Sequence, residues 1–162
     1  MQRVCLVTGA SRGIGAAIAD ALGAAGATVV GTATTEAGAA AISERFAAKG
    51  IAGAGMALDV GSPTAVDELI ARVTEQFGAP LVLVNNAGIT QDNIVLRMKD
   101  EEWARVIDTN LNSIFRLSKA VLRGMTKARW GRIVNISSVV GSMGNAGQAN
   151  YSASKGGVIA LT

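Results

Sequence analysis

Tyr151 and Lys155 are the two residues whose types and spacing most clearly suggest chemistry. They are four positions apart, so on a helix they lie on one face, one turn apart. A free phenol has a pKa near ~10, but an ammonium ~4 Å away would lower that pKa by roughly three units at an effective dielectric of ~20. The pair could therefore transfer a proton at neutral pH. The alternative is an ordinary amphipathic helix start, which is the usual meaning of an isolated Tyr-x-x-x-Lys.

Two hydroxyl groups, Ser137 and Ser138, precede this pair at the end of an apolar, β-branched run that begins at Arg132. A hydroxyl at a strand end could hold a carbonyl or alcohol oxygen beside the phenol of Tyr151. Side chains alternate along a strand, so only one of the two serines can face the phenol.

A glycine-rich segment with the sequence Thr-Gly-Ala-Ser-Arg-Gly-Ile-Gly, Thr8–Gly15, follows the first apolar run. Glycines let backbone N–H groups approach an anion, and the dipole of a following helix favours negative charge there. The spacing is Gly-x-x-x-Gly-x-Gly rather than the Gly-x-Gly-x-x-Gly of many dinucleotide folds. Its position between a strand and a helix of small residues still favours a nucleotide-binding loop over a simple tight turn.

The choice of cofactor depends on the end of the second strand, near Thr34. In NAD-selective folds an acidic residue there binds the adenosine ribose. None is present, because Glu36 is better placed in the first turn of the next helix, where the helix dipole favours it. Arg12 in the glycine loop could contact a 2′-phosphate. Both features favour NADP over NAD.

Other polar residues close the remaining strands or interrupt a helix. Asp59 and Val60 end the third strand, where a carboxylate could receive the adenine amino group or simply be solvated. The Asn-Asn-Ala-Gly segment that contains Asn86 could line a ribose or turn the chain. Asn110 lies within a predicted helix, where asparagine is unfavourable because its side chain competes for backbone hydrogen bonds. It indicates either a functional distortion or a tolerated surface residue.

Alternating strand and helix patterns must position these residues. The expected strands are Arg3–Thr8, Thr28–Ala33, Gly55–Val60, Leu81–Asn85 and Arg132–Ser137. The expected helices are Gly13–Ala25, Glu36–Lys49, Pro63–Phe77, Asp100–Lys127 and a helix from Tyr151 onward. This alternation predicts an α/β fold with right-handed βαβ units, a Rossmann-like, doubly wound parallel sheet with helices on both faces.

Composition limits the function further. The 162 residues suffice for one domain with a sizeable core, and 49% of them are apolar. The net charge is only +3, with no long cationic run, so nucleic-acid binding is not indicated. No membrane is expected as a partner either. Cys5 is the only cysteine, which excludes an intrachain disulfide and favours the reducing cytoplasm.

The two ends of the sequence carry expectations of their own. The first strand begins almost at once, which suggests no targeting peptide. An apolar helical pattern is still running at Thr162, so residues 1–162 are expected to be a single NADP-binding domain that is incomplete at its C-terminus.

Five motifs together resemble the short-chain dehydrogenase/reductase family: the glycine loop, Asn85–Gly88, Asn110, Ser138 and Tyr151-x-x-x-Lys155. Residues 85–93, 98–103 and 139–151 further resemble the bacterial 3-oxoacyl-[acyl-carrier-protein] reductases of that family. The resemblance implies NADPH-dependent reduction of a 3-oxoacyl thioester, carried by acyl carrier protein, to the 3-hydroxyacyl thioester in fatty acid biosynthesis. It also implies a homotetramer when the chain is complete, with two more strands and a mobile substrate loop.

The same resemblance implies a role for each matching residue. Tyr151 would donate the proton, and Lys155 would lower the pKa of that phenol and bind the nicotinamide ribose. Ser138, at the family's position thirteen residues before the tyrosine, would orient the ketone, and Asn110 would hold a relay water. The pyrophosphate and 2′-phosphate would contact Gly9, Ser11, Arg12, Gly13, Ile14 and Gly15, and the adenosine would contact Thr34, Asp59, Val60 and Asn86. No metal site is expected.

Two alternatives remain open. A related reductase of acyl-CoA 3-ketones or another carbonyl would use the same catalytic residues, so only the pocket and the partner surface would distinguish it. A non-catalytic nucleotide-binding module is disfavoured by the complete serine, tyrosine and lysine set.

A basic face indicates either solvated charges or a docking site for an acidic carrier; its members are Arg116, Lys119, Arg123, Lys127, Arg129 and Arg132.

Overall fold

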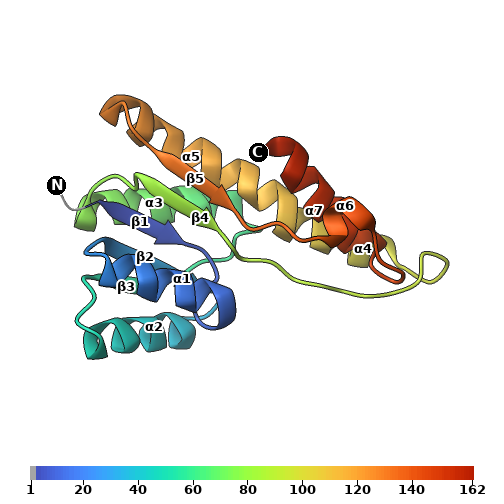
Figure 1. Ribbon diagram of the computed structural model, residues 1–162, viewed down its shortest axis with the longest axis horizontal. Coiled ribbons are helices and arrows are strands. Elements are labelled where there is room, and N and C mark those ends of the chain that lie inside the picture. Colours follow the sequence, from blue (N-terminus) through green and yellow to red (C-terminus); the bar gives the residue numbers. More distant parts are fainter. Residues whose placement is uncertain (1–2) are drawn as a thin grey trace.

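The computed structural model describes residues 3–162, which form a five-stranded parallel sheet with helices on both faces (Figure 1). The strands are β1 (Val4–Val7), β2 (Thr28–Ala33), β3 (Gly53–Ala57), β4 (Val82–Asn85) and β5 (Arg132–Asn135). Their order is β3-β2-β1-β4-β5, so the chain reverses direction across the sheet between β1 and β4. Ligands of doubly wound folds bind at the carboxyl ends of the strands beside such a reversal. The predicted Rossmann-like fold is confirmed.

The helices are α1 (Gly13–Ala24), α2 (Glu36–Ala48), α3 (Pro63–Phe77), α4 (Asp100–Ile107), α5 (Ser113–Ala128), α6 (Val140–Met143) and α7 (Ala149–Leu161), with a π-helical segment η1 (Asp108–Asn112) between α4 and α5. In Figure 1, α1 and α2 cover one face of the sheet and α3 and α5 cover the other, while α7 packs against α4, α6 and η1. None of these helices in residues 3–162 has the length and apolar character needed to cross a membrane.

Two hydrophobic cores hold the layers together. All four residues of β1 are buried, as expected of a parallel strand covered on both sides. Because side chains alternate along the strand, Leu6 packs with α3 and α5, whereas Val7 packs with α1 and α2. Gly31 in β2 lets α2 approach closely, since a Cβ there would lie 2.9 Å from Ala10 and 3.0 Å from Ile42.

The third strand was predicted wrongly as Gly55–Val60. Pairing with β2 aligns Val29 with Gly53 and Ala33 with Ala57, so β3 begins and ends earlier in the sequence. Asp59 and Val60 instead lie in the turn after the strand. There the Asp59 carboxylate accepts a hydrogen bond of 2.9 Å from the Gly61 N–H, a local turn that aspartate favours.

Other boundaries also differ from the prediction. The first and last strands are shorter than expected, so Thr8 and both Ser137 and Ser138 lie beyond the strand ends. The single expected helix Asp100–Lys127 is divided by the π-helical segment. The last helix begins two residues before Tyr151, and the short helix α6 was not predicted.

Candidate active and cofactor site

The glycine loop connects β1 to α1 and has the tight shape that its glycines permit. Gly9 and Gly13 have φ angles of +67° and +57°, which side chains other than glycine rarely adopt. A Cβ on Gly15 would collide with the carbonyl oxygen of Gly9. Within residues 3–162, the backbone N–H groups from Ser11 to Gly15 have no hydrogen-bond acceptor, as is usual at a helix start. These donors are therefore free to bind an anion.

The segment after β4 holds the loop from behind. Asn86 donates from its amide nitrogen to the carbonyls of Thr8 and Gly9 at 3.0 and 3.1 Å. In return, the Thr8 hydroxyl accepts from the N–H groups of Asn86 and Ala87, each at 3.0 Å. Asn86 is thus a structural partner of the loop as well as a residue that lines the cavity beside it.

A cavity of about 930 Å³ opens at the carboxyl ends of the strands. Its size falls within the range of cofactor and ligand sites. It is lined by every predicted cofactor residue except Tyr151 and Lys155: Gly9, Ser11, Arg12, Gly13, Ile14, Gly15, Thr34, Asp59, Val60 and Asn86. The fold therefore brings together residues from four separate loops, those that follow β1, β2, β3 and β4.

Arg105 and Asp108 also line this cavity, and neither was singled out in the sequence. The Arg116 guanidinium binds the Asp108 carboxylate at 2.6 and 3.1 Å and the Gly61 carbonyl at 3.1 Å. The hydrogen bond from Arg116 holds the pKa of Asp108 below its usual value. The pair ties η1 to the turn after β3. Asp108 and Arg116 are eight positions apart in the sequence, a spacing that does not signal a pair.

Asn110 occupies the centre of η1 and is completely buried. Its amide nitrogen donates to the Ile89 carbonyl at 2.9 Å and to the Ser154 hydroxyl at 3.1 Å, and its oxygen accepts from the Ile89 N–H at 2.8 Å. Of the two alternatives for this residue, the structure shows a distorted helix and not an exposed surface asparagine. π-Helical turns of this kind are frequent at functional sites. Both amide hydrogens of Asn110 are used to clamp the segment after β4 against α7.

Lys155 lies on α7 with only 4% of its surface exposed. Its Nζ donates to the Ile136 carbonyl at 2.6 Å, and burial lowers its pKa. The same Nζ lies 5.8 Å from the centre of the Tyr151 ring. A Cβ built on Gly88, which lines the cavity, would lie 3.8 Å from this nitrogen. The ammonium therefore lies beside both the phenol ring and the wall of the cavity.

The two serines after β5 have different surroundings. The Ser137 hydroxyl donates to the backbone carbonyl of Lys155 at 3.0 Å, so it helps to hold α7 in place. The half-buried Ser138 side chain has no hydrogen-bond partner among residues 3–162, and its carbonyl accepts from the Gly141 N–H at 3.0 Å. Of the two hydroxyls, that of Ser138 is the one available to a substrate.

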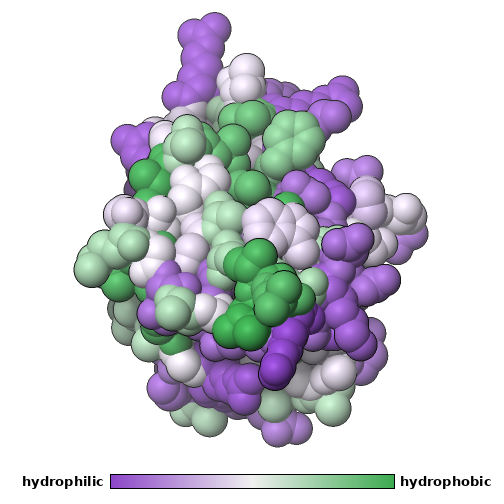
Figure 2. Space-filling view, turned by 90° about the vertical axis from the view of Figure 1, so that its right-hand side faces the viewer, coloured by the Kyte–Doolittle hydropathy of each residue, from purple (hydrophilic) through white to green (hydrophobic). Residues whose placement is uncertain are grey.

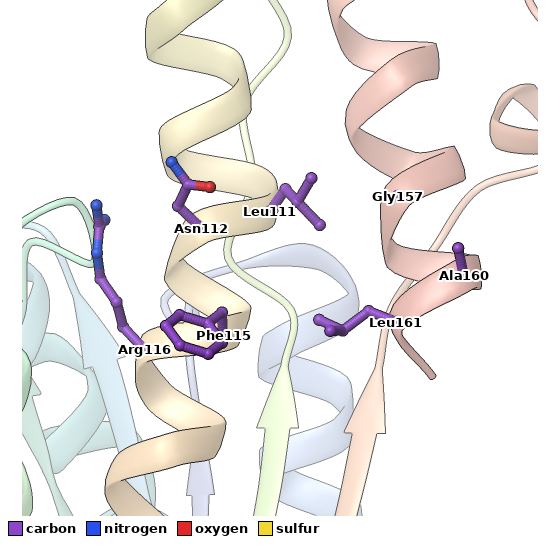
Figure 3. Close-up of a pocket in the computed structure, with 7 residues that line it drawn as sticks. All are labelled: Leu111, Asn112, Phe115, Arg116, Gly157, Ala160 and Leu161. Carbon is purple, nitrogen blue, oxygen red and sulfur yellow. The ribbon is translucent and has the colours of Figure 1, made fainter.

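A second cavity, of about 550 Å³, lies between α7 and the η1–α5 segment (Figure 3). Leu111, Phe115 and Leu161 project into it, while Arg116 extends to the other side of its helix (Figure 3). None of the predicted catalytic or cofactor residues lines it. Its apolar lining distinguishes it from the cavity beside the glycine loop.

Comparison with known proteins agrees with this architecture. A sequence profile described as short chain dehydrogenase matches residues 3–162. The chain is 61% identical over 160 residues to the 3-oxoacyl-[acyl-carrier-protein] reductase FabG of Pseudomonas aeruginosa, covering 99% of this chain and 65% of that protein. The corresponding proteins of Vibrio cholerae and Escherichia coli K12 are 60% and 56% identical, and the match covers 64% of each. This chain thus spans about 65% of the length of these relatives. The chain belongs to the short-chain dehydrogenase family.

Proposed function

We propose that this protein reduces 3-oxoacyl-[acyl-carrier-protein] to 3-hydroxyacyl-[acyl-carrier-protein] with NADPH, as a single NADP-binding domain in fatty acid biosynthesis. The observation that carries the proposal is the position of the Lys155 ammonium, 5.8 Å from the Tyr151 ring and next to Gly88 of the cofactor cavity. A proton donor and a cofactor site must meet in this way for a ketone to be reduced. Relatives named as 3-oxoacyl-[acyl-carrier-protein] reductases over 99% of the chain support the substrate class.

The cavity suits a nicotinamide dinucleotide. The free N–H groups from Ser11 to Gly15 would bind the pyrophosphate, and the absence of a side chain at Gly15 lets the loop keep its tight shape against Gly9 and Asn86. The exposed Arg12 would bind a 2′-phosphate, and Thr34 leaves that place free of an acidic group. When bound, the cofactor would supply the hydride, and the residues of this chain would supply binding, orientation and the proton.

Proton transfer falls to Tyr151. We infer that its phenol gives a proton to the ketone oxygen while the Ser138 hydroxyl holds that oxygen in position. The remaining phenolate is stabilised by the nearby Lys155 ammonium. Lys155 donates one of its three N–H groups to the Ile136 carbonyl, so two remain for the phenol and the nicotinamide ribose. Asn110 would act by holding this arrangement together and by keeping a relay water near Lys155.

An apolar surface beside Ser138 suits an acyl chain. Val139 and Met143 are 74% and 83% exposed, and Val95 and Leu96 on the segment after β4 are 73% and 92% exposed. Figure 2 shows hydrophobic side chains gathered on the face at the right of Figure 1, where α4 and α6 lie. The N–H of Asn93 binds the Gly147 carbonyl at 2.9 Å, which joins the two segments. A thioester with an apolar tail fits such a surface better than a small polar ketone.

The acidic carrier protein would dock on the basic residues at the end of α5 and the start of β5. Arg132 and Ser138 are six residues apart, or about 20 Å of extended backbone, so a flexible arm must bridge the distance to the phenol. In Figure 1 the end of α5 and the start of β5 lie at the opposite end of the molecule from α6. Positive charge there would steer an acidic partner.

A homotetramer is the proposed assembly, and the cytoplasm is the proposed compartment. Phe115, Leu122, Ile159 and Leu161 leave between 47% and 57% of their surfaces exposed on α5 and α7, which a second copy would cover. The single cysteine, Cys5, is free and buried in β1, as suits a reducing compartment. Light scattering of the purified protein, with Phe115→Lys as a disrupting variant, tests the assembly.

NADPH oxidation with an acetoacetyl thioester tests the function. We expect a higher specificity constant, kcat/KM, with acetoacetyl-[acyl-carrier-protein] than with acetoacetyl-CoA. Equal or higher kcat/KM with the CoA thioester would favour the acyl-CoA reductase instead. NADPH binding without any ketone reduction would indicate a non-catalytic nucleotide-binding protein.

A further inference from the structure

Four successive carbonyl groups of the glycine loop are held by side chains from elsewhere in the fold. Asn86 binds those of Thr8 and Gly9, as described above. The next two are bound by Arg45 of α2: its Nη2 donates to the Ala10 carbonyl at 2.7 Å and its Nη1 to the Ser11 carbonyl at 3.4 Å. Arg45 is 35 residues from Ala10 in the sequence, so only the packing of α2 brings them together.

These contacts set the direction of the neighbouring N–H groups. In a trans peptide the C=O and the following N–H point in opposite directions, and residues 3–162 contain no cis peptide. When the Ala10 and Ser11 carbonyls face Arg45, the N–H groups of Ser11 and Arg12 point away from it. Ser11 and Arg12 line the cofactor cavity, whereas Arg45 does not. The two N–H groups are therefore turned from the α2 side of the loop, where Arg45 lies.

Arg45 is itself held in place by an ion pair between α1 and α2. Its Nε donates to Asp20 at 3.1 Å, and the Lys49 Nζ binds the other oxygen of the same carboxylate at 2.7 Å. Burial raises the pKa of Asp20, but hydrogen bonds and charges from Lys49 and Arg45 outweigh this and hold it below its usual value. Asp20 is thus ionised at neutral pH and orients the Arg45 guanidinium. Lys49 shares the carboxylate without any contact to the loop carbonyls.

We propose that Arg45 is a positioning residue of the phosphate loop, which keeps the N–H groups of Ser11 and Arg12 directed at the pyrophosphate of a dinucleotide. The inference rests on the proposed function, since it requires that the cavity binds a nicotinamide dinucleotide. NADPH and NADH share the pyrophosphate. Arg45 therefore contributes equally to the affinity for both, unlike Arg12, whose contribution depends on the 2′-phosphate.

Binding titrations of Arg45→Met test this role. Methionine keeps an apolar stem but removes both bonds to the loop. We expect the dissociation constants for NADPH and NADH to rise by the same factor, roughly ten-fold, as for the loss of charge-assisted hydrogen bonds. Adenosine 2′-monophosphate, which has no pyrophosphate, should bind as tightly to the variant as to the wild type. Arg45→Lys, which keeps one charged donor, should recover part of the lost dinucleotide affinity.

Lys49→Met is the matched control, because it removes the other partner of Asp20 and leaves the loop untouched. It should change both dissociation constants by less than about two-fold, within the range of an exposed ion pair. Thermal unfolding of each variant tests for loss of fold, and Arg45→Lys replaces Arg45→Met if the latter unfolds.

Several results would overturn the inference. Unchanged dinucleotide binding by a folded Arg45→Met protein excludes a positioning role. A loss confined to NADPH would make Arg45 a contact of the 2′-phosphate, and an equal loss in Lys49→Met would make the ion pair alone responsible. These outcomes leave the proposed function intact, whereas a wild-type protein that binds neither NADPH nor NADH would refute both.

Discussion

Replacing Asn110 with alanine should destabilise the fold more than any other single change in the π-helical segment. The substitution removes three hydrogen bonds and leaves the Ile89 N–H and C=O without their side-chain partners. An unpaired buried polar group costs about 1–3 kcal/mol; because the bonds to Ile89 are only part-buried, the lower end of this range applies and the two backbone groups together predict a loss of roughly 2 kcal/mol. The Ser154 hydroxyl loses a donor as well but keeps its own bond to the Tyr151 carbonyl at 2.7 Å. Against a typical total stability of about 5–15 kcal/mol, the loss is large.

Denaturant unfolding measures this loss, with the m-value as a check that unfolding remains two-state. Asn112→Ala is the matched control in the same segment, because Asn112 is exposed and makes one bond of 3.0 Å to Asp108. It should change the free energy of unfolding by less than about 0.5 kcal/mol. Hydrogen exchange at the Ile89 amide should accelerate in Asn110→Ala only. A loss below about 1 kcal/mol, or equal losses in both variants, would refute the view that Asn110 clamps this site.

Three further predictions concern the reaction itself. Tyr151→Phe should abolish nearly all ketone reduction while NADPH still binds, and Lys155→Ala should impair both; wild-type turnover by the Tyr151→Phe enzyme would contradict the assigned proton donor. Arg12→Ala should weaken NADPH far more than NADH, by about 1.5–3 kcal/mol in binding free energy, and an equal loss for both cofactors would make Arg12 structural. Arg129→Glu should raise KM for the carrier-linked substrate but not for a small CoA analogue, as should higher ionic strength. Among residues 3–162, Arg129 is the non-glycine residue with a positive φ, 51°, so Arg129→Gly should stabilise the fold by about 1 kcal/mol while still weakening the binding of the carrier-linked substrate. Similar KM changes for both substrates would place the docking site elsewhere.

Local patterns were sufficient to predict several elements. The apolar run at Val4–Val7 followed by glycines predicted a strand and a tight loop, and both are present. The expected helix Pro63–Phe77 is present as α3, and the Ser62 hydroxyl just before it accepts a hydrogen bond from the Ala65 N–H at 3.3 Å. Such features depend on residues within one turn or one strand of each other, so the sequence carries them directly.

Other features depend on residues that are far apart in the chain. The position of β3 follows from its pairing with β2, which moved Asp59 and Val60 out of the strand. The choice between Ser137 and Ser138 depends on a contact with Lys155, 18 residues away. The alternation of apolar residues along a strand does not indicate such contacts, because it is compatible with either register of β3 and with either serine facing the phenol.

Local sequence patterns alone indicate the order of strands and helices along the chain, the glycine loop, and the helix face that Tyr151 and Lys155 share. The tertiary structure decided which polar groups meet. Asn110 bonds to Ile89 across 21 residues, and Arg45 reaches Ala10 across 35, although no local pattern in the sequence indicates either contact. The physical reason is that a hydrogen bond between distant residues depends on how whole layers pack, whereas a turn or a helix start depends only on its immediate neighbours.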